Sequence, residues 1–179
     1  AGRGVATDGF LIYYQPEHLM SMYKRGRVLI NRAFLHMVFH CLLGHMDTRG
    51  KRAVPYWNLA CDIAIESIID EFYVKNVYRH QSVYRREVYA KLKEKLRVLT
   101  AEGIYKLLQD MDLTEEEYER MAAEFYVDNH DHWEREEDPR IRQERQNKWQ
   151  NNREKMQTEM ESFGEKDAED SRSLLEAVR

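Results

Sequence analysis

Two long apolar segments dominate the pattern of hydrophobic and polar positions along the chain. They predict one helix over residues 27–46 and a second over residues 57–72. In both segments apolar side chains fall on nearly every face of a helix, a pattern typical of helices that are buried on most sides. We therefore expect these two helices to form the centre of the core.

Shorter elements are predicted around this core. A turn signal at residues 7–9 precedes a β-prone segment, residues 10–14, which predicts a short strand. Other helices are indicated by Pro16 at a first helical position, by the amphipathic pattern of residues 83–99, and by the N-cap residues Thr100 and Thr114. The predicted fold is α+β and mostly helical, with two buried helices, a small β element and wrapping helices.

The composition changes after about residue 135. Residues 138–163 are strongly polar, with apolar positions too sparse for a core, and Gly164 is a stop signal for a helix. The sequence predicts a domain over residues 1–135 and a polar helical extension or connector over residues 136–179.

Length, charge and cysteine content narrow the class of protein. The chain has 179 residues, 42% of them hydrophobic, which is enough for one domain with a substantial core. Its net charge of −4 gives no global basic field for nucleic acid. No apolar run reaches the roughly 18 residues of a membrane span. Cys41 and Cys61 are too few for a disulfide framework, so we expect reduced thiols and a cytoplasmic location.

The candidate chemistry begins with two histidines in the first apolar segment. His36 and His40 are four residues apart, a spacing that places both rings on one face of a helix. Zinc peptidases present two nitrogen ligands in this way, in the motif H-E-x-x-H. In this chain Met37 occupies the position of the motif's glutamate, which is the usual general base.

Two carboxylates in the second apolar segment are the natural partners of these histidines. Asp62 and Glu66 lie one helical turn apart, and unpaired polar groups are costly to bury. If the two helices pack antiparallel, His36, His40 and Asp62 can bind one zinc ion with water in the fourth position. Glu66 could orient a histidine ring, bind the metal or act as a stand-in base.

Three alternatives remain open at this point. His45 or His130 could complete the site, although His45 lies about 140° around the helix from His40. The acids could instead form buried salt bridges with Arg27, Arg32 or the basic loop at residues 47–56. Residues 128–133, Asp-Asn-His-Asp-His-Trp, could form an N-cap and a turn with a packed tryptophan.

The order of these motifs resembles a known family. A Thr-Asp-Gly turn, a short strand, H-x-x-x-H-x-x-x-x-H, W-N-x-A-x-D-x-x-x-E and a late D-x-H-x-x-W are shared with the bacterial family of putative metallopeptidase domains that precede a von Willebrand factor A-like domain. Such proteins are often encoded beside MoxR-type AAA+ ATPases. The resemblance implies a zincin-like core, zinc, peptide hydrolysis, and an A-like domain and an ATPase as partners.

Met37 departs from the family pattern and shapes the functional prediction. Without the glutamate, we expect a zinc-binding domain that is weak or inactive in hydrolysis and acts with an ATPase and an A-like domain. The alternative is an active zinc peptidase that uses Glu66 as general base. A third possibility is a metal-free helical protein whose buried polar groups pair among themselves.

Overall fold

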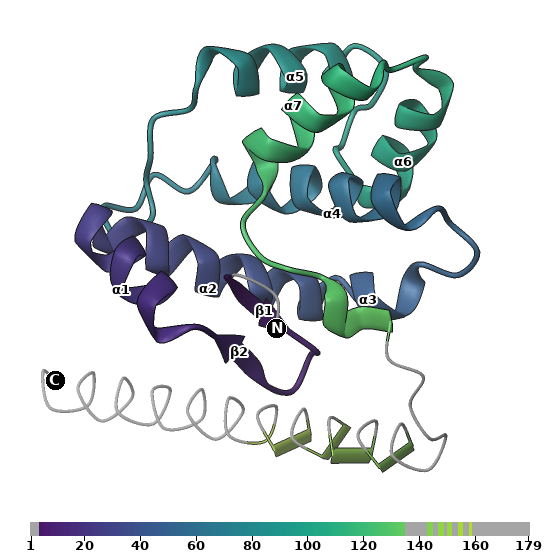
Figure 1. The fold of residues 1–179 in the computed structure, drawn as a ribbon. Helices are drawn as coiled ribbons and strands as arrows, with labels where there is room; N and C mark the ends of the chain where they lie inside the picture. The colour runs from purple at the N-terminus through teal and green to yellow at the C-terminus, as the bar shows by residue number, and fades with distance from the viewer. Residues whose placement is uncertain are drawn as a thin grey trace, which may run out of the picture. The chain divides into compact units, whose positions relative to one another are not determined.

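A computed structural model describes residues 4–134 and, beyond them, residues 143–144, 147–148, 150–151, 154–155 and 158. The chain divides into two units, residues 1–135 and residues 136–179. The elements of the first unit are β1 (Val5–Thr7), β2 (Ile12–Tyr14), α1 (Pro16–Arg25), α2 (Arg27–Leu42), α3 (His45–Thr48), α4 (Val54–Ile69), α5 (Val83–Lys93), α6 (Ala101–Asp110), α7 (Glu115–Phe125) and the 3-10 helix η1 (Asp131–Glu134) (Figure 1). The predicted α+β, mostly helical class is confirmed.

The centre of the core is α4. Its side chains Trp57, Ile63, Ile65 and Ile69 are all 0% exposed, and the helix packs against α2, α6 and α7. Pro55 lies in the first turn, where a missing backbone N–H costs nothing. Figure 1 shows α2 and α4 running antiparallel, as expected from the loop that joins them. The prediction of a buried second helix is confirmed.

The prediction that the first helix is buried on most sides is wrong. The buried face of α2 includes three polar residues, Arg32, His36 and His40. Its apolar residues Phe34 and Leu42 are 55% and 67% exposed. Because the polar side chains of α2 turn inward toward partners on α4, much of its apolar surface faces outward.

The first helix also ends earlier than expected. It stops at Leu42 rather than residue 46, because Gly44 adopts a left-handed conformation with φ of 65°. The chain then restarts as α3 at His45, a buried residue. The break frees His45 from the spacing of α2, so its ring is no longer held about 140° away from that of His40.

A two-stranded antiparallel sheet lies beside α2. The predicted strand is present as β2, but residues 10 and 11 belong to a turn, because Asp8 Oδ1 accepts hydrogen bonds from their backbone N–H groups. On β1, Val5 O accepts a hydrogen bond from Asn129 N at 2.8 Å, and Ala6 forms a parallel bridge with Asn129. The segment after α7 is therefore held along β1, next to α2.

Thr100 and Thr114 are confirmed as the N-cap residues of α6 and α7. Thr100 accepts a hydrogen bond from Gly103 N, and Thr114 forms a reciprocal capping box with Glu117. The helix expected over residues 83–99 is shorter, ending at Lys93. These two caps determine where α6 and α7 begin. After its last residue, α7 leads directly into the segment that lies along β1.

The second unit is described only in part. The described residues between 143 and 158 are helical. The end of the predicted polar helix and residues 165–179 lie outside the described residues, so the predicted role of residues 136–179 as a polar helical extension or connector stays a prediction. Among the residues that can be described, no helix is long and apolar enough to cross a membrane.

Candidate metal centre

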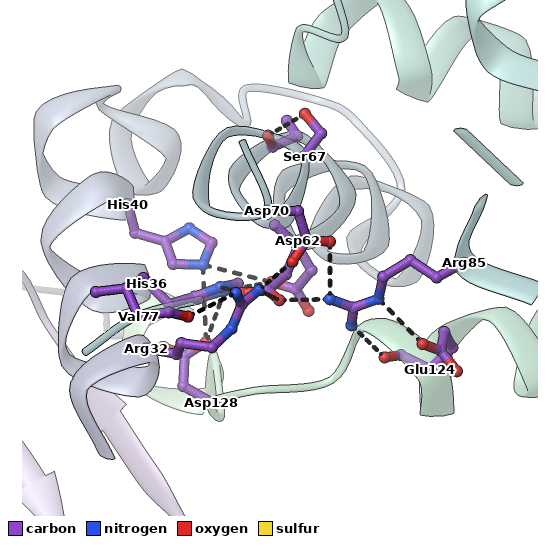
Figure 2. Close-up of polar contacts among 12 residues, drawn as sticks. Arg32, His36, His40, Asp62, Ser67, Asp70, Val77, Arg85, Glu124 and Asp128 are labelled. Carbon is purple, nitrogen blue, oxygen red and sulfur yellow. Dashed lines mark hydrogen bonds and ion pairs between the residues drawn. The ribbon is translucent and has the colours of Figure 1, made fainter. Parts of the chain in front are cut away.

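Five buried side chains meet between α2, α4 and the segment that follows α7. They are His36, His40, Asp62, Asp128 and His130, and one ligand atom from each lies within 4.8 Å of all the others. The structure thus brings together His36, His40 and Asp62, the three ligands predicted from the sequence, and adds two residues. Figure 2 shows His36 and His40 projecting from α2 toward Asp62, with Asp128 approaching from the loop after α7.

The distances within this cluster fit one small cation. The Nε2 atoms of the three histidines lie 3.2–3.4 Å from Asp62 Oδ1 and 3.1–3.7 Å from Asp128 Oδ1. Ligand atoms that surround zinc tetrahedrally with bonds of about 2.0–2.1 Å are separated by about 3.4 Å. The distances from the histidine nitrogens to the aspartate oxygens are therefore close to those between ligands of one metal ion.

His40 gives the clearest sign that the cluster requires a further partner. Its Nε2 atom is buried and makes no hydrogen bond within the described residues, although it lies 3.4 Å from Asp62 Oδ1. Asp128 Oδ2 also has no hydrogen-bond partner there. Leaving a buried polar group unpaired costs about 1–3 kcal/mol, which a metal bond at Nε2 would offset.

The Nδ1 atoms of His36 and His40 have partners outside the five-residue cluster, so the two Nε2 atoms are directed at the aspartates; His36 Nε2 lies 3.3 Å from Asp62 Oδ1. His36 Nδ1 lies 3.0 Å from Glu66 Oε1, and His40 Nδ1 lies 3.2 Å from His45 Nδ1. When Nδ1 carries the proton and donates it to such a partner, Nε2 presents a lone pair, the arrangement usual for metal-binding histidines. His45 is thus placed behind His40 rather than among the five ligand atoms.

Protonated histidines and a metal ion are alternative ways to balance the negative charge of Asp62 and Asp128. Burial lowers the pKa of His36, but Asp62, Glu66 and Asp128 outweigh it and raise that pKa to about 10. Burial also lowers the pKa of His130, but Asp62 and Asp128 outweigh it and raise that pKa to about 9. Burial dominates at His40 and lowers its pKa to about 3. A divalent cation could replace the two protons without changing the buried charge.

An aromatic side chain covers one side of the cluster. The Trp133 ring, in η1, stacks on His130 at 3.8 Å between centroids and meets His40 edge-on at 4.6 Å. The expected turn with a packed tryptophan is therefore present. His130, one of the two histidines left open as a further ligand, joins the cluster, whereas Asp128 was not anticipated and the D-x-H-x-x-W motif was the available signal for it.

Glu66 is held by buried arginines as well as by His36. Arg32 Nη2 and Arg85 Nη1 donate to Glu66 Oε2 at 2.6 and 2.7 Å. The salt bridge with Arg32 was one of the alternatives left open by the sequence, whereas Arg85 was not anticipated. Burial raises the pKa of Glu66, but the hydrogen bond with His36 and the charges of Arg32 and Arg85 lower it to about 2.

Met37 does not present a polar group to the cluster. Its side chain is 4% exposed and belongs to a hydrophobic cluster with Val5, Met22 and Ala33. A thioether is also a weak hydrogen-bond acceptor. The position that carries the general base in the H-E-x-x-H motif is thus part of the apolar core between α2, α1 and β1.

The fold and the site together define a mostly helical domain with a buried group of three histidines and two aspartates suited to a metal ion. The model of the family described as "Putative metallopeptidase domain" matches residues 2–175, so the chain belongs to this family. The resemblance noted from the sequence is confirmed to that extent. Searches of curated proteins and of solved structures found no match.

Proposed function

We propose that this domain binds one divalent transition-metal ion, zinc above all, through His36, His40 and Asp62, with Asp128 and His130 completing the site. The observation that supports this most directly is the convergence of three Nε2 and two Oδ1 atoms at the spacing of metal ligands. Imidazole nitrogen suits zinc, and aspartate oxygen is a common further ligand.

We also propose that the domain is weak or inactive as a hydrolase. Catalytic zinc sites keep a position open for water or substrate, whereas sites that are closed by protein ligands are structural. Here five protein donors lie within 4.8 Å of one another, Met37 packs in the core, and both oxygens of Glu66 have partners. The metal would then stabilise the packing of α2, α4 and the segment along β1.

Elemental analysis tests metal binding directly. Protein purified without a nickel column should contain about one zinc ion per chain, because the donor set is complete and buried. Iron or manganese at the same stoichiometry would support the proposed site but show that its metal is not zinc. No bound metal, together with no binding of added zinc, iron or manganese, would favour a metal-free helical protein instead.

The runner-up is an active zinc peptidase that uses Glu66 as general base. A positioned base contributes typically ~10²–10⁴-fold, and the low pKa of Glu66 makes it a poor one. We expect the zinc-loaded protein to cleave casein at the same background rate with and without a chelator. Chelator-sensitive cleavage that disappears in Glu66→Gln at saturating zinc would establish the peptidase instead.

Replacing Met37 by glutamate should destabilise the fold. The new carboxylate would lie among Val5, Met22 and Ala33, and an uncompensated buried charge costs about 3–5 kcal/mol. Thermal unfolding of Met37→Glu should therefore begin well below that of the wild type. Met20→Glu is the matched control, because Met20 is 54% exposed and surface changes alter stability by about 0.5 kcal/mol or less. Equal melting temperatures for the two variants would show that the position of Met37 can accommodate a carboxylate.

The cellular setting of the domain is proposed from its resemblance. We propose a cytoplasmic protein in which this domain acts beside a von Willebrand factor A-like domain and a MoxR-type AAA+ ATPase. The motif order at residues 7–9, 36–45, 57–66 and 128–133 supports this proposal. Co-purification of the ATPase with the tagged full-length protein from its native host would test it.

A further inference from the structure

Glu66 belongs to a buried network of ion pairs whose members are not among the proposed metal ligands. Glu66 Oε2 accepts hydrogen bonds from Arg32 Nη2 and Arg85 Nη1, while Glu66 Oε1 lies 3.0 Å from His36 Nδ1. The same two arginine nitrogens donate to Asp70, at 2.6 Å to Oδ1 and 3.2 Å to Oδ2. Figure 2 shows the two guanidinium groups approaching the carboxylates of α4 from α2 and from the side of α5.

This network is almost completely removed from solvent. Arg32, Glu66, Asp70 and Arg85 are 3%, 1%, 6% and 4% exposed. Two positive and two negative charges balance, but a buried ion pair is often no more stabilising than apolar side chains of the same volume. Stability alone is therefore a weak reason for placing four charges directly behind a histidine of the cluster.

Other acceptors hold each arginine on its outer side. Arg32 Nη1 donates to Val77 O at 3.3 Å, in the loop between α4 and α5. Arg85, on α5, donates from Nε and Nη2 to the side-chain and backbone oxygens of Glu124 on α7, at 3.0 and 2.7 Å. With several donors of each planar guanidinium occupied, neither group is free to rotate. The two arginines thus present fixed donors to Glu66.

We propose that Arg32 and Arg85 are positioning residues for the metal site. By holding Oε2 of Glu66, they leave Oε1 as the acceptor for His36, which fixes the His36 ring with Nε2 directed at Asp62. This inference rests on the proposed metal binding and adds to it the control of affinity by residues that touch no ligand atom. Outer partners of this kind typically contribute 10–100-fold to metal affinity.

Conservative variants of the arginines test the proposal. Lysine keeps the charge and most of the apolar stem, but its single ammonium cannot reproduce the planar set of donors. Arg85→Lys and Arg32→Lys should each weaken zinc binding about tenfold or more, measured by competition with a chromophoric chelator. Arg120→Lys is the matched control: Arg120 is exposed, lies over the Tyr84 ring at 4.0 Å, and should bind zinc like the wild type.

A second measurement separates positioning from general loosening of the fold. Nitrogen-15 spectra of the imidazole rings in zinc-loaded protein should show His36 protonated at Nδ1 in the wild type. In Arg85→Lys the His36 signals should shift or broaden while those of His130 stay unchanged. In a double-mutant cycle, Arg85→Lys should have little further effect on affinity in a Glu66→Gln background, because both changes act through the same carboxylate.

The outcomes are distinguishable. Folded lysine variants with zinc affinities within about twofold of Arg120→Lys, or fully additive losses in the cycle, would overturn this inference alone. If neither lysine variant folds, Glu66→Gln replaces them, since both arginines act through this carboxylate, and an unchanged zinc affinity in Glu66→Gln would overturn the inference. A wild-type chain that binds no metal would overturn the proposed function together with this inference.

Discussion

Replacing His40 by alanine should abolish metal binding and remove the stabilisation that metal provides. The ring is 0% exposed, and its Nε2 atom faces both aspartate oxygens without a hydrogen bond to any residue that the structure describes. Zinc at about 1,000 times its Kd stabilises the protein that binds it by about 4 kcal/mol. For a domain of this size, that is an increase in Tm of roughly 10 °C.

The measurement is thermal unfolding with zinc and with a chelator, for wild type, His40→Ala and a control. The wild type should gain roughly 10 °C with zinc, and His40→Ala should gain almost nothing. His80→Ala is the control, because His80 is exposed and lies outside the five-residue group. A zinc-dependent gain that persists in His40→Ala would place the metal somewhere other than this cluster.

Truncating Ile65 to alanine should destabilise the domain by about 2–5 kcal/mol. Ile65 is 0% exposed on α4, the helix on which α2, α6 and α7 all pack. Removing its larger side chain leaves a cavity that neighbouring elements can fill only in part. Denaturant unfolding in the presence of a chelator measures this packing without a contribution from metal.

The matched control is Leu42→Ala on α2. Leu42 and Ile65 lie in the two segments that the sequence predicted to be buried helices, but Leu42 is 67% exposed in the structure. Its truncation should change stability by about 0.5 kcal/mol or less, as is usual for surface positions. Similar large losses at both positions would mean that the exposed face of α2 is covered by a partner in solution.

The sequence alone was sufficient for the local part of the site. A four-residue spacing on a helix fixes the relative direction of two side chains, so the pairing of His36 with His40 follows from their spacing. The same periodicity put Asp62 and Glu66 on one face of α4. The caps at Thr100 and Thr114 were also predictable, because a capping residue acts within one turn of its own helix.

The positions of Asp128 and His130 were decided by tertiary structure. They lie more than sixty residues beyond Asp62 and reach the cluster because Asn129 pairs with β1, a strand that the hydrophobic pattern did not predict. Strand pairing between distant segments depends on where the rest of the chain has already placed them. A motif could mark these residues, but periodicity could not say which side chains they would meet.

The surroundings of Glu66 and the orientation of α2 also depended on tertiary structure. Hydropathy indicates how much apolar surface a helix carries, but not which face its neighbours cover. In this chain the buried face of α2 is set by ionic partners, since Arg32 and His36 both pair with Glu66 on α4. Periodicity along the sequence therefore determined the helices and two pairs of candidate ligands. The packing of distant segments around buried charges determined the complete metal centre.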